Sequence, residues 1–286
     1  MSTPRETASQ PEEQQPAEQR PAADGRWRVR IIEVGVLPGS ALAAYVLGAL
    51  DDIFFDLPCY AYLLDDGTTR VIVDSGPDAA ASAELYEVRG DGRTAILAAL
   101  AAAGLEPESV DVLVHTHLHQ DHVQNDALFP RAQVVVQGRE LDEAVACEVR
   151  CLALSGRARA RLAAGSYRRS QAAGLWYVGV SDWLAGVGDR LRRVDGRVDL
   201  LPGLTLVPSA GHTGGHQSDL VQTGAGPVCI AGDVVPLGIN REVVGPMTPD
   251  EEPARAFLRM ARDAGWEILP SHDPALRDHR WYRAPR

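Results

Sequence analysis

Residues 115–122, HTHLHQDH, place four histidines and one aspartate within eight positions. The whole chain of 286 residues contains eight histidines, so half of them fall in this stretch. Imidazole and carboxylate side chains together are typical ligands of zinc and similar divalent metals, and neutral histidine offers a free ring nitrogen at about pH 7. The stretch therefore predicts metal binding, with enough donors for two ions.

A buried strand is expected to carry these donors, because the apolar residues DVLV come directly before them. Alternate side chains of a strand share a face, so His115, His117 and His119 point the same way if the strand continues through them. Asp121 and His122 then belong to the following loop or helix start. His115 lies one strand step deeper than His117, and we expect it to support the site rather than bind a metal.

Further strand and helix patterns lie on both sides of this stretch. Residues 94–104 and 249–265 are expected to be helices that end at Gly104 and Gly265. The strand candidates are residues 27–37, 59–76 as two strands with a turn at Asp65, Asp66 and Gly67, 132–137, 204–212, 218–224, 227–235 and 266–273. This order of elements predicts an α/β domain in which helices cover the sheets.

The chain is expected to form one folded domain over residues 26–286. Residues 1–25 are rich in Pro, Glu and Gln and are predicted to be a disordered tail, because they offer little apolar area to offset the entropy of ordering. Residues 139–195 are predicted to be a helical, arginine-rich insertion. Either this insertion is a solvated helical face, or it is a lid or dimer contact that carries Trp176, Tyr177 and Trp183 toward a pocket.

Composition excludes several classes of partner. A formal net charge of −11 disfavours nucleic acid and anionic membranes, since both select a basic surface. No apolar run is long enough for a membrane span or a secretion signal, so we expect a cytoplasmic protein. The four cysteines, Cys59, Cys147, Cys151 and Cys229, form no disulfide framework and are interpreted as mostly buried thiols.

The histidine cluster carries a resemblance to a known family. The pattern of His117, His119, Asp121 and His122 resembles the HxHxDH signature of the metallo-β-lactamase-fold hydrolases. Further motifs occur in the order found in that family, and they are VIVDSG with Asp74, GHTGGH with His212, AGD with Asp233 and PSHDP with His272. The resemblance covers roughly residues 57–275.

This resemblance implies a four-layer αββα sandwich whose active site lies along one edge of the two sheets. It also implies a site with two zinc ions, or with iron, manganese or cobalt in their place. His117, His119 and His212 would hold the first ion, and Asp233 would bridge the two. The ligands of the second ion would be Asp121, His122 and His272.

The roles of four other groups stay open at this stage. Asp121 either transfers a proton to the leaving group or only binds metal. Asp74 either orients a ligand or only forms a turn with Ser75 and Gly76. His216 either supports a ligand or lies at the surface, and His279 is expected to take no part.

Within the family, the flanking residues look most similar to the N-acyl-homoserine-lactonase branch. The resemblance therefore implies a hydrolase that opens a lactone or another ester-like bond of a small molecule, and dimers are common among such proteins. Thioester hydrolysis of the glyoxalase II or acyl-carrier type, and phosphoester hydrolysis, remain alternatives. One departure concerns the substrate: Pro236 stands where the lactonases commonly have a tyrosine that contacts the substrate carbonyl.

Overall fold

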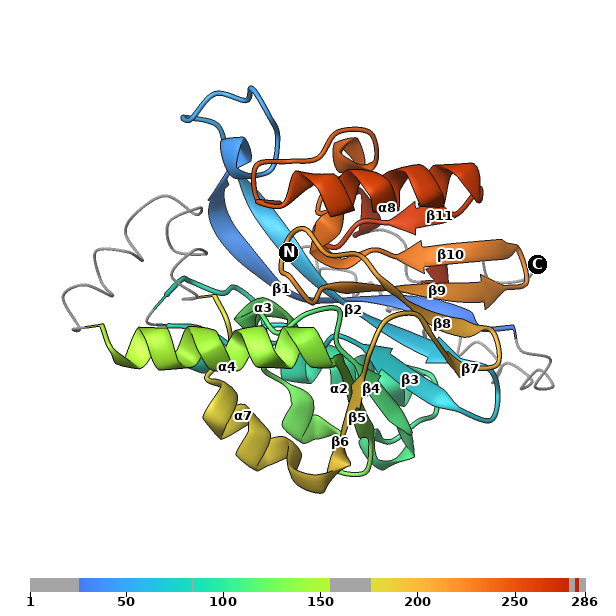
Figure 1. Ribbon diagram of the computed structural model, residues 1–286. Coiled ribbons are helices and arrows are strands. Elements are labelled where there is room, and N and C mark those ends of the chain that lie inside the picture. Colours follow the sequence, from blue (N-terminus) through green and yellow to red (C-terminus); the bar gives the residue numbers. More distant parts are fainter. Residues whose placement is uncertain (1–25, 84, 155–175, 278–280, 283–286) are drawn as a thin grey trace, which may run out of the picture.

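Two β-sheets form the centre of the protein (Figure 1). The structure is a computed structural model that describes residues 26–83, 85–154, 176–277 and 281–282. In the seven-stranded sheet the order is β12 (Trp281–Tyr282), β1 (Arg28–Ala41), β2 (Phe54–Asp65), β3 (Arg70–Val73), β4 (Val112–Val114), β5 (Gln133–Gln137) and β6 (Leu191–Val194). In the five-stranded sheet it is β11 (Glu267–Leu269), β10 (Gly226–Ile230), β9 (Gln217–Thr223), β8 (Leu204–Pro208) and β7 (Val198–Leu201).

Helices lie on the outer sides of the two sheets. The α-helices are α1 (Ala79–Ser82), α2 (Gly92–Ala102), α3 (Gln120–Val123), α4 (Gly138–Leu152), α7 (Val180–Val187) and α8 (Glu251–Asp263). The 3-10 helices are η1 (Leu42–Ala44), η2 (Pro107–Ser109), η3 (Asp126–Leu128), η4 (Gly188–Arg190), η5 (Gly232–Val234), η6 (Gly238–Arg241) and η7 (Pro274–Leu276). Within the described ranges, no helix combines the length and the apolar content that a membrane crossing requires.

The alternation of side chains along the strands produces three separate apolar layers. On β5, Val134 and Val136 pack into a cluster with α2, α4 and α7, whereas Val135 packs into the cluster between the sheets. A third cluster joins the outer face of the five-stranded sheet to Phe257 and Leu258 of α8. Successive residues of a strand point to opposite faces, so each strand contributes to two layers. The predicted αββα sandwich is thereby confirmed.

Most of the expected elements are present, and three short strands are additional. The strand predicted for residues 27–37 is β1, and the hairpin predicted for residues 59–76 is β2 and β3. The helices expected at 94–104 and 249–265 are α2 and α8, each followed by a glycine in the left-handed region. Strands β6, β7 and β12 are not predicted by the sequence. The segments of β6 and β7, LRRV and VDLL, are short and mix charged with apolar residues, and β12 has only two residues.

The prediction of a helical segment over residues 139–195 needs correction at its end. Its first part is α4 and a later part is α7, but Leu191–Val194 forms the edge strand β6, which pairs in parallel with β5. Backbone pairing with β5 outweighs the local sequence preference there. Residues 155–175 of this segment, and the tail predicted for residues 1–25, lie outside the described residues.

Candidate metal centre

The histidine-rich stretch begins where β4 ends. Strand β4 stops at Val114, and after a loop the chain enters α3 at Gln120. The condition under which His115, His117 and His119 would share one strand face is therefore not met, because strand β4 does not continue through them. The His115 Nε2 atom lies 2.8 Å from Asp126 Oδ2, and the ring is fully buried, as expected for a supporting residue.

The topology brings the remaining predicted ligands from distant parts of the chain to one sheet edge. Strands β10 and β11 are parallel with Ile230 opposite Leu269, and Asp233 and His272 each lie three residues beyond this pair. His212 lies in the loop between β8 and β9. All seven candidate ligands are at most 8% exposed, and they are His117, His119, Asp121, His122, His212, Asp233 and His272.

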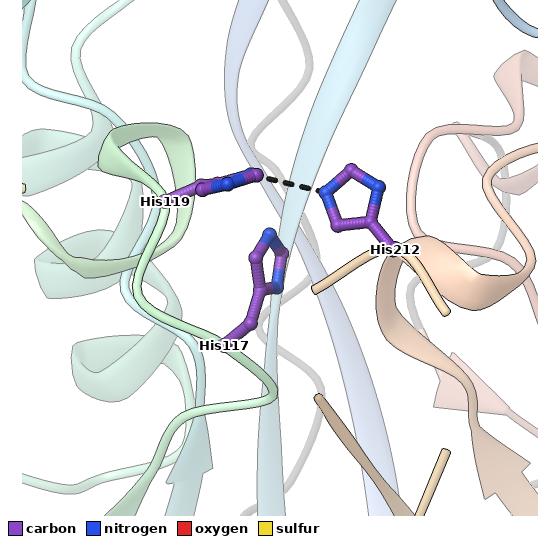
Figure 2. Close-up of side chains that lie close together, drawn as sticks. All are labelled: His117, His119 and His212. Carbon is purple, nitrogen blue, oxygen red and sulfur yellow. Dashed lines mark hydrogen bonds between the residues drawn. The ribbon is translucent and has the colours of Figure 1, made fainter. Parts of the chain in front are cut away.

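Three imidazoles form the first group of donors. His117, His119 and His212 have ligand atoms within 4.8 Å of one another. His119 Nδ1 lies 3.0 Å from His212 Nε2, and Figure 2 shows the three rings turned toward a common point. Three imidazoles in this arrangement match the donor set of zinc in proteins.

Asp121, His122 and His272 form the second group. The Nε2 atoms of His122 and His272 each lie 3.7 Å from Asp121 Oδ2. Because a carboxylate and two imidazoles face one another inside the protein, this group can also hold a divalent cation.

Asp233 lies between the two groups and faces each with a different oxygen. Its Oδ2 atom is 3.4 Å from His212 Nε2 and 4.0 Å from His117 Nε2. Its Oδ1 atom is 3.3 Å from His122 Nε2 and 3.0 Å from His272 Nε2. One carboxylate can therefore contribute an oxygen to each of two neighbouring cations.

Hydrogen bonds to backbone carbonyls define which ring nitrogen carries the proton in His272 and His212. His272 Nδ1 lies 2.8 Å from the Pro58 carbonyl, and His212 Nδ1 lies 3.0 Å from the Met247 carbonyl. A carbonyl can only accept, so each Nδ1 carries the proton and each Nε2 keeps its lone pair. The Nε2 atoms of His117 and His122 are buried and have no hydrogen-bond partner among the described residues. A divalent cation would satisfy them, so the residues fit a metal centre.

Asp74 holds the ring of one of these candidate ligands. Its Oδ2 atom accepts hydrogen bonds at 2.8 Å from His122 Nδ1 and from Thr116 Oγ1, and its Oδ1 atom accepts from the Thr116 amide. Burial alone would raise the pKa of Asp74, but the imidazoles of His122 and His115 hold this pKa well below its usual value. Asp74 is also the non-glycine residue with positive φ, 55°, in the described backbone. These contacts favour the orienting role over that of a turn residue alone.

His216 supports Asp233 and is not a surface residue. Its Nε2 atom accepts the Asp233 amide hydrogen at 3.0 Å, so its Nδ1 carries the proton and donates to Ser209 Oγ at 2.8 Å. Ser209 then donates to Ser218, whose hydroxyl donates to the Ala231 carbonyl. Burial and the neighbouring His212 lower the pKa of His216 to about 3, so the ring remains neutral.

Glu140 connects the two loops that carry the first group of donors. This buried residue in the first turn of α4 accepts from the Leu118 amide at 2.9 Å, between His117 and His119. It also accepts from Thr213 Oγ1 at 2.6 Å, next to His212. Burial raises the pKa of Glu140 to about 7. The sequence gives no local signal for this role, because Leu118 and Thr213 are both far from Glu140 in the chain.

Two further residues near the site were not singled out by the sequence. The Cys59 thiol shares a group of ligand atoms with Asp121 and His272, all within 4.8 Å of one another. Tyr45 is also buried; its burial, followed by the charges of Asp233 and Asp121, raises the pKa of its phenol. Neither residue belongs to a recognisable motif.

The end of the arginine-rich segment does contact the site. Tyr177 and His119 form an isolated antiparallel β-bridge through their backbones. Their rings also pack edge to face, with the ring centroids 4.9 Å apart. Trp183 Nε1 donates to Asp126 at 2.7 Å, and Trp176 stacks on Tyr86. These aromatic residues therefore pack beside the histidine loop. The lid interpretation also involves residues 155–175, which lie outside the described ranges.

Pro236 lies next to the second group of donors. Its carbonyl accepts the His272 amide hydrogen at 2.9 Å. Proline carries no side-chain hydroxyl, so a substrate contact from a phenol at this position is absent.

Comparison with known proteins places this geometry in context. The family model described as the Metallo-beta-lactamase superfamily matches residues 55–272. An N-acyl homoserine lactonase of a Bacillus species is 26% identical over 192 residues, which cover 62% of this chain and 64% of the lactonase. The chain thus spans less than two thirds of that relative.

Two other similarities extend over more of the chain. Metallo-beta-lactamase domain-containing protein 1 of Xenopus laevis is 28% identical over 256 residues, which cover 86% of each chain. A solved structure of AidC, described as a dizinc quorum-quenching lactonase in complex with a product, superposes with a TM-score of 0.64 at 16% identity. That superposition covers 91% of this chain and 92% of AidC, and it shows a shared fold.

Proposed function

The chain belongs to the metallo-beta-lactamase superfamily of hydrolases, and from this membership we propose that it is a dinuclear zinc enzyme that opens a lactone or a similar ester. The observation that carries the proposal is Asp233, whose two oxygens face two separate groups of donors. His117, His119 and His212 would hold the first ion. Asp121, His122 and His272 would hold the second.

Two bound divalent ions would supply a nucleophilic hydroxide at neutral pH and polarise the carbonyl of the substrate. The protein's own residues would hold this centre rigid. Asp74 fixes the ring of His122, and the carbonyls of Met247 and Pro58 fix those of His212 and His272. Because the orienting partners are already in place, little reorganisation is needed during the reaction.

Asp121 is the residue proposed to carry a proton to the leaving group. It is 8% exposed, more than any other candidate ligand, so it is the most accessible to a substrate. Its Oδ2 atom faces both His122 and His272, and it can therefore bind metal and exchange a proton at the same place.

The lactone assignment is supported by the Bacillus relative and by the shared fold with AidC. An opened lactone keeps its leaving oxygen tethered to the product, so no separate binding site for a leaving group is required. Because Pro236 provides no phenol, polarisation of the substrate carbonyl would depend on the metal centre itself. A small-molecule substrate and a cytoplasmic location complete the proposal.

Metal analysis and lactone hydrolysis test the proposal together. We expect close to two metal ions per chain, opening of acyl-homoserine lactones, and loss of that activity on chelation. His117→Ala should lower kcat/KM by about 100-fold or more, since stabilisation of the transition state by the centre is lost. His279→Ala is the matched control, because we expect His279 to take no part.

Matched oxoester and thioester substrates provide the comparison with the alternative function. Faster cleavage of the thioester would favour the thioesterase alternative. Lactone opening that survives complete removal of metal would contradict the dinuclear mechanism.

A further inference from the structure

Cys59 is the least expected side chain at the second group of donors. It lies on β2 and is 1% exposed. Its sulfur, a ligand oxygen of Asp121 and a ligand nitrogen of His272 all lie within 4.8 Å of one another. We infer that Cys59 provides a thiolate ligand to the second metal ion, an inference that rests on the proposed two-metal centre.

The backbone of β2 holds this thiol in register with the site. The residue before it, Pro58, accepts the Nδ1 hydrogen of His272 at 2.8 Å. Strand β2 therefore orients His272 through the Pro58 carbonyl and places the sulfur of Cys59 at the next position. Cys59 is also opposite Gly35 in the antiparallel pair of β1 and β2, so pairing with β1 holds β2 in place at this position.

The charges around the sulfur favour a cation there. Asp121 places a carboxylate oxygen within 4.8 Å of the Cys59 sulfur, in the group that also contains His272. A thiolate at this place needs a positive partner, and a divalent metal shared with Asp121 and His272 supplies one. On binding, the thiol proton is released to solvent and the sulfur lone pair enters the metal–ligand bond.

The other buried cysteines serve as internal comparisons. Cys147 on α4 and Cys229 on β10 are both buried. Within the described ranges, neither belongs to a group of side chains able to hold a metal. Burial of a thiol is therefore common in this protein, whereas the position beside Asp121 and His272 is particular to Cys59.

A sulfur ligand would make the two metal positions chemically different. The first position has imidazoles and one oxygen of Asp233, whereas the second adds sulfur to nitrogen and oxygen. Thiolate favours zinc, cobalt and other softer ions over magnesium or manganese. We expect the second position to discriminate more strongly between these metals.

Cobalt substitution tests the inference directly. The protein loaded with two cobalt(II) ions should show a thiolate-to-cobalt charge-transfer band in the near ultraviolet, and the band should grow as the second ion binds. Cys59→Ser should lose this band and bind the second ion about tenfold or more weakly. Cys229→Ser, the matched control, should keep both properties. X-ray absorption of the zinc protein should show one sulfur at about 2.3 Å.

The outcomes separate this inference from the proposed function. Two bound cobalt ions without a thiolate band, or a band that persists in Cys59→Ser, would overturn the sulfur ligand and leave the dinuclear hydrolase intact. Failure of the unaltered protein to bind two ions would overturn both. Cys59→Ala, checked by circular dichroism, should repeat the Cys59→Ser result and shows that the loss does not come from misfolding.

Discussion

At the scale of single residues, the site depends on which ring nitrogen of each histidine carries a proton. Carbonyl acceptors define this for His212 and His272, and the carboxylate of Asp74 does so for His122. His216 works in the opposite sense, because its Nε2 atom accepts from the Asp233 amide. Hydrogen bonds therefore fix the orientation of all four rings.

Replacing His216 should disturb the centre without removing a ligand. His216→Phe leaves the buried Asp233 amide without an acceptor, which costs about 1–3 kcal/mol. We expect a lower unfolding temperature and weaker metal retention in a chelator competition. His216→Gln, which keeps an acceptor, should recover part of both. Unchanged metal retention in His216→Phe would show that this hydrogen bond does not position Asp233.

Glu140 should make the stability of the protein depend on pH. Its pKa is raised to about 7 in the folded protein from an ordinary value of 4.5, so the folded state binds more protons between these values. Stability contributed by this group is therefore complete below about pH 4.5 and is lost as the pH rises toward 7. Glu140→Gln should flatten that part of a urea-unfolding profile measured against pH.

Glu143 offers the matched control for that measurement. It lies on the same helix, is only partly buried, and accepts from the Gly214 amide at 2.9 Å. Glu143→Gln should leave the slope between pH 4.5 and 7 as it is in the unaltered protein. Equal slopes in all three proteins would contradict the role assigned to the burial of Glu140.

At the scale of elements, the site is formed where loops meet the ends of strands and helices. The β8–β9 loop with the sequence GHTGGH packs against the first turn of α4, and Glu140 joins that loop to the loop after β4. Strands β10 and β11 end at the same edge and carry Asp233 and His272. The positions of the donors are therefore set mainly by the strand ends and by the contacts with α4.

The two adjacent glycines of this loop should differ sharply in their tolerance to alanine. A Cβ at Gly215 would collide with the backbone nitrogen and Cα of Glu140, which cannot move without displacing α4. A Cβ at Gly214 would meet the end of the Glu143 side chain, which can rotate away. We expect Gly215→Ala to cost about 1–3 kcal/mol and to reduce metal content, whereas Gly214→Ala should cost less than about 1 kcal/mol. Thermal unfolding and metal analysis of both variants provide the check, and similar losses would contradict the close approach of α4.

At the scale of the whole molecule, the two sheets are held together by an apolar layer that also surrounds a buried acidic side chain. Asp219 on β9 lies opposite Leu206 and Ile230, both of which belong to the layer between the sheets. Its carboxylate is fully buried and has no hydrogen-bond partner in the described part of the chain. Burial, with a smaller effect from Asp74, raises the pKa of Asp219 well above its usual value.

Removing this carboxyl group should stabilise the fold. Asp219→Val extends the apolar layer and avoids a buried unpaired group, so we expect a gain of about 1–3 kcal/mol. Because the folded-state pKa is raised, the gain should be smallest in acid and grow as the pH rises. Asp219→Asn, which keeps a polar group of the same shape, should gain less. A lower unfolding temperature for Asp219→Val at neutral pH would show that the carboxylate has a partner of its own.

The surface of the molecule also has an apolar feature, at the connection between β1 and β2. The large apolar side chains exposed there are Leu47, Leu50, Ile53 and Phe54. This connection extends away from the sheets in Figure 1. Exposed apolar groups of this kind are compatible with a homodimer of this chain, and sedimentation at several concentrations would test for one.

By itself, the sequence determined most of the secondary-structure elements and which residues are candidate donors. The strand patterns before His117 and Asp233 are local, and the spacing of HxHxDH, GHTGGH, AGD and PSHDP carries the family resemblance. Local patterns also predicted β1, β2 and β3, because the apolar residues along a strand indicate which of its faces are buried.

Only the tertiary structure decided how these donors are arranged. The end of β4 at Val114 leaves His115, His117 and His119 outside the strand, and pairing with β5 makes residues 191–194 a strand. The orientation of the two Asp233 oxygens and the contacts of Glu140 and Cys59 join residues far apart in the chain. Such contacts depend on strand register and on packing between layers, and these are set by the whole chain rather than by any short stretch of it.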